Sequence, residues 1–172
     1  MEHSVEALKE SYKTNPIFEY FTQEEFDQFL GITEIITYEA NEVIFETNQE
    51  PRGLYVLTEG NVKVTQVRDG KEPRILAELK APTVLGEMAL LEKRKRTSTA
   101  TAGVRTTALF LDKNRFHDAL KSNELMAYKL SHNLGTILAQ KIVAMNNHMM
   151  EMKQSIKEFS NFKNSLFSDW NF

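Results

Sequence analysis

The chain contains no cysteine, only 4 prolines and 7 glycines among its 172 residues, and no apolar run long enough to span a membrane. The absence of cysteine excludes disulfide bonds, iron–sulfur clusters and thiolate zinc sites. The first residues, 1–6, lack the basic and then apolar pattern of a signal peptide. We therefore expect a cytoplasmic protein that does not cross a membrane.

Positive charge is also scarce relative to negative charge. The chain has 21 Lys and Arg residues against 24 Asp and Glu residues, which gives a net charge of -3. This balance argues against broad electrostatic binding to nucleic acid. Hydrophobic residues make up 41% of the chain and charged residues 26%, as in a globular protein with a real core. The length suits one domain with an appendage.

Clustered metal ligands and catalytic residues are missing as well. The four histidines are scattered along the sequence: His3, His117, His132 and His148. Their spacing is not that of a metal site, and no Ser–His–Asp or Cys–His arrangement is visible. We therefore predict no metal, no cofactor and no enzymatic activity.

Apolar residues at helical spacing mark the N-terminal segment, which we place at residues 1–30: Phe18, Phe21, Phe26, Phe29 and Leu30. Thr22 and Glu25 have the spacing of a capping box, so a short helix is expected to begin at Gln23.

From about residue 31 the period changes to that of short strands. We expect strands at 42–45, 53–57, 62–67, 97–101 and 107–111, and a hairpin turn at Asp69-Gly70 that leads to a strand at Ile75-Leu76. Short strands at roughly regular spacing favour an antiparallel β-roll of the jelly-roll type, placed at residues 31–120. The predicted fold class is α+β: this roll, N-terminal helices and a long C-terminal helix.

Helical spacing returns after Asp112, with a short helix at 114–120 and a long one from about 123 to 159. Two sets of residues repeat every seven positions in the long helix: Gly135, Ile142, Met149, Ile156 and Leu138, Met145, Met152, Phe159. This a/d seam favours a coiled-coil homodimer, with 121–159 as hinge and dimerisation helix. Packing of the helix on its own roll is the alternative. The sequence assigns no structure to the tail, 160–172.

The most informative segment is 85–99. Gly86 allows a close backbone approach or a strained turn, and residues 87–91 can form one helical turn whose free N–H groups attract an anion. Arg96, expected to begin the next strand, can grip a phosphate with two hydrogen bonds. A carboxylate such as Glu87 beside a phosphate makes sense if it accepts a hydrogen bond from a ribose hydroxyl. Together these features describe a ribose phosphate pocket.

The segment resembles the phosphate-binding cassette of the cyclic-nucleotide-binding domain family, which includes catabolite activator proteins and the regulatory subunits of cyclic-AMP-dependent kinase. The family pattern reads here as Leu85, Gly86, Glu87, Met88, Ala89, Leu90 and then Arg96, Thr97, Ser98, Thr99. The resemblance extends upstream over 38–45 and 54–64, and covers about residues 16–120. Two positions depart from it: Lys95 stands where proline is frequent, and Ser98 where alanine is frequent.

This resemblance implies a role for each matching residue. The backbone at Gly86, Met88 and Ala89 would hold the cyclic phosphate, Glu87 the ribose hydroxyl, and Arg96 the phosphate charge. Thr97 or Ser98 would lie near phosphate and base, and the apolar walls would come from Val64, Leu76 and Leu85. In the family the helix after the roll often closes over the base, and Lys141 is the candidate base contact here.

Three functions compete. A nucleotide sensor fits the cassette, and cyclic AMP is favoured by the bacterial character of the sequence, although Thr97 resembles cassettes that prefer cyclic GMP. A catabolite-activator-like regulator would need a DNA-binding domain, for which 160–172 is too short, so we expect no direct DNA binding and allow an effector protein as partner. A barrel enzyme would need metal ligands that are missing. Some family members have a degenerate cassette and serve only as scaffolds.

The basic run at 92–96 has a less specific interpretation. Such a run could mark a nucleic-acid patch, but in an acidic chain it is more often a solvated loop. Only Arg96 is excepted, because it belongs to the cassette pattern.

Overall fold

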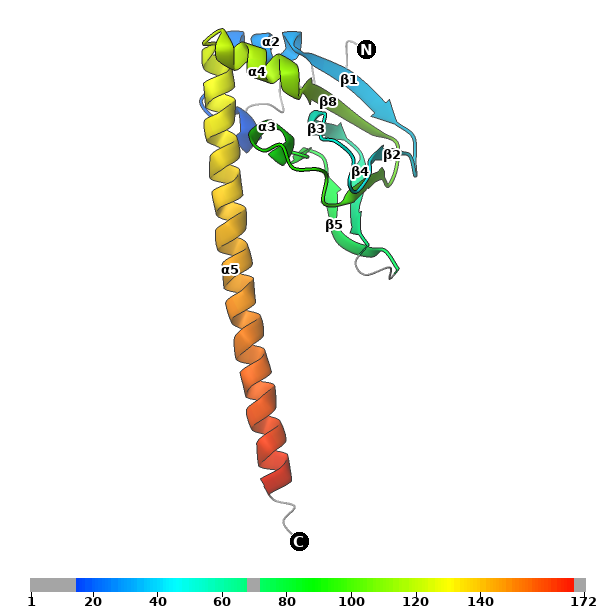
Figure 1. Ribbon diagram of the computed structural model, residues 1–172, viewed down its shortest axis with the longest axis vertical. Coiled ribbons are helices and arrows are strands. Elements are labelled where there is room, and N and C mark those ends of the chain that lie inside the picture. Colours follow the sequence, from blue (N-terminus) through cyan, green and yellow to red (C-terminus); the bar gives the residue numbers. More distant parts are fainter. Residues whose placement is uncertain (1–14, 68–71, 169–172) are drawn as a thin grey trace. The chain divides into compact units, whose positions relative to one another are not determined.

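The computed structural model describes residues 15–67 and 72–168 (Figure 1). The chain divides into two compact units, residues 1–134 and residues 135–172, and the division falls inside the last helix. In chain order the elements are η2 (Pro16–Phe18), α2 (Gln23–Gly31), β1 (Thr33–Tyr38), β2 (Val43–Phe45), β3 (Gly53–Glu59), β4 (Asn61–Gln66), β5 (Arg74–Lys80), β6 (Thr83–Leu85), α3 (Met88–Leu91), β7 (Thr99–Ala102), β8 (Thr106–Asp112), α4 (Lys113–Lys121) and α5 (Leu125–Ser168).

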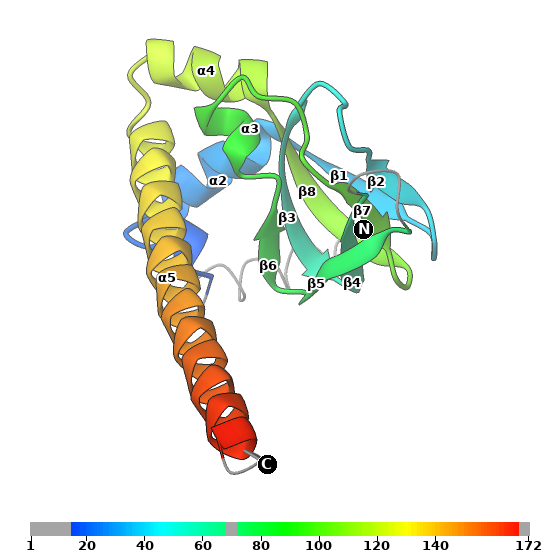
Figure 2. The ribbon, with the colours of Figure 1, turned by 60° about the horizontal axis from the view of Figure 1, so that its bottom comes forward.

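The strands of the first unit form two four-stranded sheets, ordered β1-β8-β3-β6 and β2-β7-β4-β5. Every pairing between neighbours is antiparallel. Figure 2 shows the strands curling into a roll, with α3 lying close to α4. The structure thus confirms the α+β fold with an antiparallel β-roll and flanking helices.

The hydrophobic core of the roll is built by side chains from both sheets. It contains Tyr38, Ile44, Phe45, Tyr55, Leu57, Val62, Leu85, Ala100, Ala102, Ala108 and Phe110, all at most 8% exposed. Small alanines on β7 and β8 leave room for the aromatic rings, and Tyr55 packs against Phe110 with ring centroids 4.9 Å apart. Burial of this cluster fixes where β6 ends, and therefore where the turn before α3 begins.

The expected capping box opens α2. The Thr22 hydroxyl accepts a hydrogen bond from the Glu25 backbone N–H, and the Glu25 carboxylate accepts one from the Thr22 N–H at 2.7 Å. Phe18 of η2 lies edge-on to Phe26 and Phe29 of α2, with centroids 5.0 and 4.9 Å away. The described part of the N-terminal segment, from residue 15 onward, is therefore packed into the first unit.

Two polar side chains of α5 attach this segment to the helix. The Lys129 ammonium donates to the Glu25 carboxylate and to the Tyr20 carbonyl, at 2.7 and 2.8 Å. The buried Asn133 amide donates to the carbonyls of Ile17 and Glu19, at 2.9 and 2.7 Å. Hydrogen bonds of this kind tie the beginning of α5 to η2 and α2, so the three elements form one packed block of the unit.

These contacts give Glu25 a testable role in stability. Burial raises the pKa of the Glu25 carboxyl, but hydrogen bonds from Lys129 and Thr22 outweigh it, so the pKa is lowered overall. A lowered pKa in the folded state adds stability above the unfolded-state pKa, and this contribution is lost as the pH falls through the folded-state pKa. We expect Glu25→Gln to lower the free energy of unfolding by about 1–3 kcal/mol at pH 7.

Urea denaturation at pH 7 and at acidic pH, with Glu24→Gln as control on the exposed face of the same helix, measures this effect. The loss caused by Glu25→Gln should shrink as the pH is lowered. A loss of equal size at pH 7 and at pH 3 would show that the carboxylate charge contributes nothing.

The structure corrects several expected boundaries. β1 and β6 were not predicted as strands, and the strand expected at 97–101 begins at Thr99 instead. Arg96 does not begin this strand but lies in the loop before it, because its backbone pairs with Asn48 and Gln49 of the loop after β2. The expected turn at Asp69-Gly70 lies outside the described residues, but β4 and β5, which flank it, do pair antiparallel.

The last helix begins at Leu125 and runs to Ser168, past the expected end at Phe159. Residues 160–168, to which we assigned no structure from the sequence, are thus helical. The apolar seam residues of the second unit are exposed in the single chain: Ile142, Met145, Met149, Met152 and Ile156 are 45–69% accessible. Among residues 15–67 and 72–168, no helix combines the length and the apolar character needed to cross a membrane.

Candidate functional site

The candidate site begins where β6 ends and the chain turns into α3. Gly86 lies in this turn with a φ of +76°, in the left-handed region that favours glycine. The turn is closed by hydrogen bonds from the Ala89 N–H to the Gly86 carbonyl, at 3.0 Å, and from the Leu90 N–H to the Glu87 carbonyl, at 3.2 Å. The N–H of Met88 has no backbone acceptor within the described part of the chain. Such a first turn offers N–H groups to an anion.

Arg96 reaches back under this turn and is only 8% exposed. Its guanidinium donates hydrogen bonds to the Gly86 carbonyl at 3.1 Å and to the Gly53 carbonyl at 2.7 Å. Its Cζ lies 4.1 Å from the centre of the Phe45 ring, a cation–π contact. A Cβ at Gly86 would come within 2.6 Å of the guanidinium, so a side chain here would strain the backbone at this φ and push Arg96 away from the turn.

The charge of Arg96 is not neutralised by an ion pair within the residues that the structure describes. Burial lowers the pKa of the guanidinium, while Tyr55 and Glu87 act in the opposite direction. The Nε of Arg96 is buried and lacks a hydrogen-bond partner in the same part of the chain. Arginine stays charged even when its pKa is lowered. The buried cation is surrounded by carbonyl groups and an aromatic ring, and a bound anion would stabilise its charge.

The turn, α3 and Arg96 border a pocket of about 220 Å³. Nine of the eleven residues predicted from the sequence line it: Val64, Leu85, Gly86, Glu87, Met88, Ala89, Arg96, Thr97 and Ser98. Glu87 is half-buried beside α3, and its side chain does not cap that helix. The structure thus brings the cassette residues together around one concave site.

One predicted residue of the first unit, Leu76, does not line this pocket. Leu76 is 56% exposed. Along β5 Ala77 and Leu79 are partly buried and Glu78 is exposed, so Leu76 falls on the exposed side of the strand. A β-bulge also leaves it without a partner on β4, where Val64 pairs with Ala77 and Thr65 with Ile75. Lys141 belongs to the second unit, and its contact with a base stays a prediction.

The end of β2 and the loop after it also contribute to the pocket, which was not predicted from the sequence. Phe45 and Pro51 line the pocket, and the Thr47 N–H donates to the Thr99 hydroxyl at 3.1 Å. The signal for Phe45 was an aromatic residue in the predicted strand 42–45. Pro51 carried no signal, since its place depends on how the loop pairs with the segment around Arg96.

Comparison with protein families identifies the class. The model of the cyclic nucleotide-binding domain matches residues 35–123, just over half of the chain. The chain therefore belongs to the cyclic-nucleotide-binding domain family. The matched range contains both sheets apart from the first residues of β1, together with the pocket and α4.

Individual relatives agree with this family. The cyclic AMP receptor protein of Thermus thermophilus is 28% identical over 130 residues, which are 76% of this chain and 58% of that protein. The cAMP-dependent protein kinase regulatory subunit of Dictyostelium discoideum is 32% identical over 87 residues, 49% of this chain and 27% of that protein. This chain therefore spans less than two thirds of the length of the curated relatives it matches.

A solved structure shows the same fold. The cyclic nucleotide-binding domain from Methylobacillus flagellatus superposes with a TM-score of 0.74, at 16% identity, over 84% of this chain and 82% of that one. In the described ranges of our chain, no group of three or more His, Cys, Asp or Glu side chains could hold a metal ion.

Proposed function

We propose that this protein is a regulatory sensor that binds a cyclic nucleotide, preferably cyclic AMP, in the pocket at 85–99. The observation that carries the proposal is the buried guanidinium of Arg96 beneath the first turn of α3, which has no ion pair among residues 15–67 and 72–168. A cyclic phosphate seated there would supply the negative charge and accept hydrogen bonds from the N–H groups of the turn. The proposal includes the absence of catalysis and a cytoplasmic location, where a diffusible nucleotide is available.

Glu87 is proposed to read the ribose. It lines the same pocket as Arg96 and precedes α3 directly. A carboxylate in this place can accept a hydrogen bond from the ribose 2′-hydroxyl, as acidic residues do in dinucleotide sites. The preference for cyclic AMP is supported by the names of the two curated relatives. Thr97 is the residue whose hydroxyl would favour cyclic GMP instead.

The output is proposed to pass through α5. The helix would have more than one position, and the nucleotide would favour the position to which it binds more tightly. In that position Lys141 would contact the base. The exposed seam of the second unit supports a homodimer, because a long apolar stripe is seldom left uncovered on a soluble chain. A regulator of the catabolite activator type that acts through a partner is the second candidate, supported by the relative from Thermus thermophilus. A non-binding scaffold is the third, and a lack of nucleotide binding would leave it as the remaining candidate.

The role of Glu87 predicts a selective loss. Glu87→Gln keeps the size of the side chain but removes its charge, so binding of cyclic AMP should weaken by about tenfold, the effect of roughly 1.4 kcal/mol. Binding of the 2′-deoxy analogue should change much less, because that ligand lacks the hydroxyl. Isothermal titration of both ligands into both proteins measures the four affinities. Equal losses for the two ligands would show that Glu87 has a structural role and does not read the ribose.

A further inference from the structure

A second cavity lies in the first unit, between α3, the loop that follows it and α4. Its volume is about 470 Å³. Ala89 and Glu92 line both this cavity and the nucleotide pocket, so one short segment of chain forms a wall of each. We refer to it as the α3–α4 cavity. A molecule bound here would touch the segment that is proposed to hold the cyclic phosphate.

Two acidic residues border the α3–α4 cavity, and both already have cationic partners. Glu92 pairs with Arg94, at 3.0 Å, and Glu50 pairs with Lys95, at 3.6 Å. These partners line the nucleotide pocket or its rim. Each carboxylate is thus paired with a cation of the neighbouring site. The charges of the α3–α4 cavity that remain to be considered are those of its lysines.

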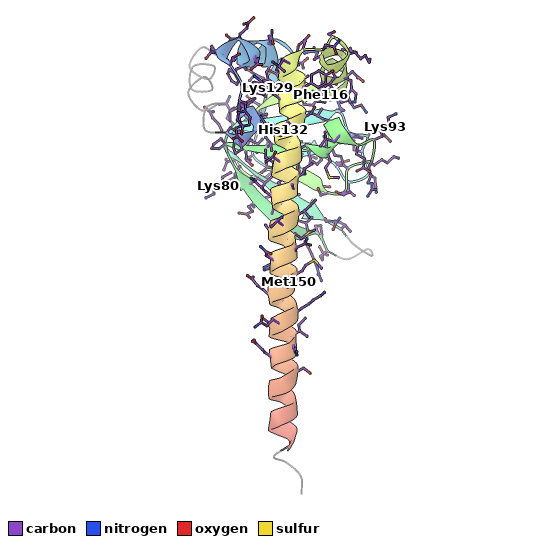
Figure 3. All side chains as sticks on the ribbon, turned by 90° about the vertical axis from the view of Figure 1, so that its left-hand side faces the viewer. Lys80, Lys93, Phe116, Lys129, His132 and Met150 are labelled. Atoms are coloured by element: carbon purple, nitrogen blue, oxygen red, sulfur yellow. The ribbon has the colours of Figure 1, made fainter. Side chains whose placement is uncertain are left out.

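Three lysines line the cavity: Lys93 in the loop after α3, and Lys113 and Lys121 on α4. Lys121 pairs with Asp118 at 2.9 Å. The ammonium groups of Lys93 and Lys113 have neither an ion pair nor a hydrogen bond within residues 15–67 and 72–168. Figure 3 shows Lys93 projecting outward at the edge of the unit. The cavity therefore presents two uncompensated positive charges.

An apolar surface lies beside these charges. Leu91, the last residue of α3, is 46% exposed and lines the cavity. None of the polar side chains that line it is buried; each is exposed or half-buried. A site for a small anion would enclose its ligand and hold it with a few fixed polar groups. Ammonium groups beside an exposed apolar side chain instead complement a partner surface that offers carboxylates next to an apolar residue.

We propose that the α3–α4 cavity binds an acidic segment of a partner protein, with carboxylates at Lys93 and Lys113 and an apolar side chain against Leu91. Since Ala89 and Glu92 belong to both sites, nucleotide and partner each change the affinity for the other by the same factor. Only this coupling rests on the proposed nucleotide function. The surface itself does not.

The probe is the acetylated and amidated peptide Glu-Glu-Leu-Glu-Glu, titrated into the full chain and followed by amide NMR shifts. We expect saturable shifts at 89–93 and at the beginning of α4, with a Kd of about 1 mM or lower. The double variant Lys93→Glu with Lys113→Glu should weaken binding by about tenfold or more. Lys80→Glu, an exposed lysine on β5 outside both cavities, is the matched control and should bind as the parent does. Lys93→Gln with Lys113→Gln gives an intermediate loss, and unchanged circular dichroism shows that the variants fold.

The alternatives give different results. Equal shifts with Gln-Gln-Leu-Gln-Gln, or shifts that survive the double charge reversal, overturn the proposal. Equal shifts with citrate or inorganic phosphate at the same concentration also overturn it, because they identify a site for small anions. Saturating cyclic AMP should change the peptide affinity by about fivefold or more, and an unchanged affinity overturns the coupling. If the protein binds the peptide but no cyclic nucleotide, the proposed docking surface is supported and the nucleotide function is refuted.

Discussion

Arg96→Ala is expected to weaken cyclic nucleotide binding by about 2–5 kcal/mol, because a phosphate charge would be left in a partly buried site without its partner. This corresponds to a loss of tens- to thousands-fold in affinity. The guanidinium lies directly beneath the turn at Gly86 and makes its hydrogen bonds to carbonyls, so it is already in place for a ligand. Isothermal titration of parent and variant with cyclic AMP measures the difference.

Two controls separate binding from folding. Arg96 also packs on Phe45, so its removal lowers stability, and thermal unfolding must show that the variant is folded at the temperature of the titration. Arg96→Lys retains the charge but not the planar fork, and should lie between parent and alanine variant. Arg105→Ala removes an exposed arginine that pairs with Glu39 and should bind as the parent does. An Arg96→Ala protein that is folded and binds as tightly as the parent would refute the assignment of the site.

The second large effect concerns the proposed dimer. Met145→Glu combined with Met149→Glu would place four carboxylates in the seam of a parallel two-stranded coiled coil, and burial of like charges strongly opposes association. Light scattering should show a dimer for the parent and a monomer for the double variant. The two methionines lie in the second unit, outside the roll that contains the pocket. The monomeric variant should therefore still bind nucleotide.

A matched control uses two apolar residues outside the seam. Val143 and Met150 are 59% and 71% exposed on the same helix, each one residue after a seam position. Val143→Glu with Met150→Glu adds the same charge but should leave the dimer intact. If the seam variant stays dimeric, or if both variants dissociate alike, the dimer is not formed by this seam.

The cassette was predictable from the sequence because its residues are close together in the chain. Gly86 to Ala89 form one local turn, and the spacing to Arg96 is set by a short loop, so local rules were sufficient. The capping box at Thr22 was predictable for the same reason. Nine of the expected residues then line a single pocket.

The remaining features depend on contacts between distant residues. Ile75 and Leu76 are adjacent apolar residues, so the sequence alone does not say which of them faces the core; that depends on how β5 pairs with β4. The three-residue strand β6 is too short to show a period. Pro51 reaches the pocket only because the backbone of Arg96 pairs with the loop after β2.

The most direct test of the nucleotide function is calorimetric titration of the unmodified protein with cyclic AMP, cyclic GMP and linear 5′-AMP. Measurement at two temperatures ensures that a binding enthalpy close to zero at one of them is not taken for a lack of binding. We predict saturable binding of one cyclic AMP per chain, weaker binding of cyclic GMP, and 5′-AMP the weakest of the three. A tenfold preference for cyclic GMP would contradict the preferred base and direct attention to Thr97. No binding of either cyclic nucleotide at both temperatures would contradict the central claim that this pocket is a cyclic nucleotide site.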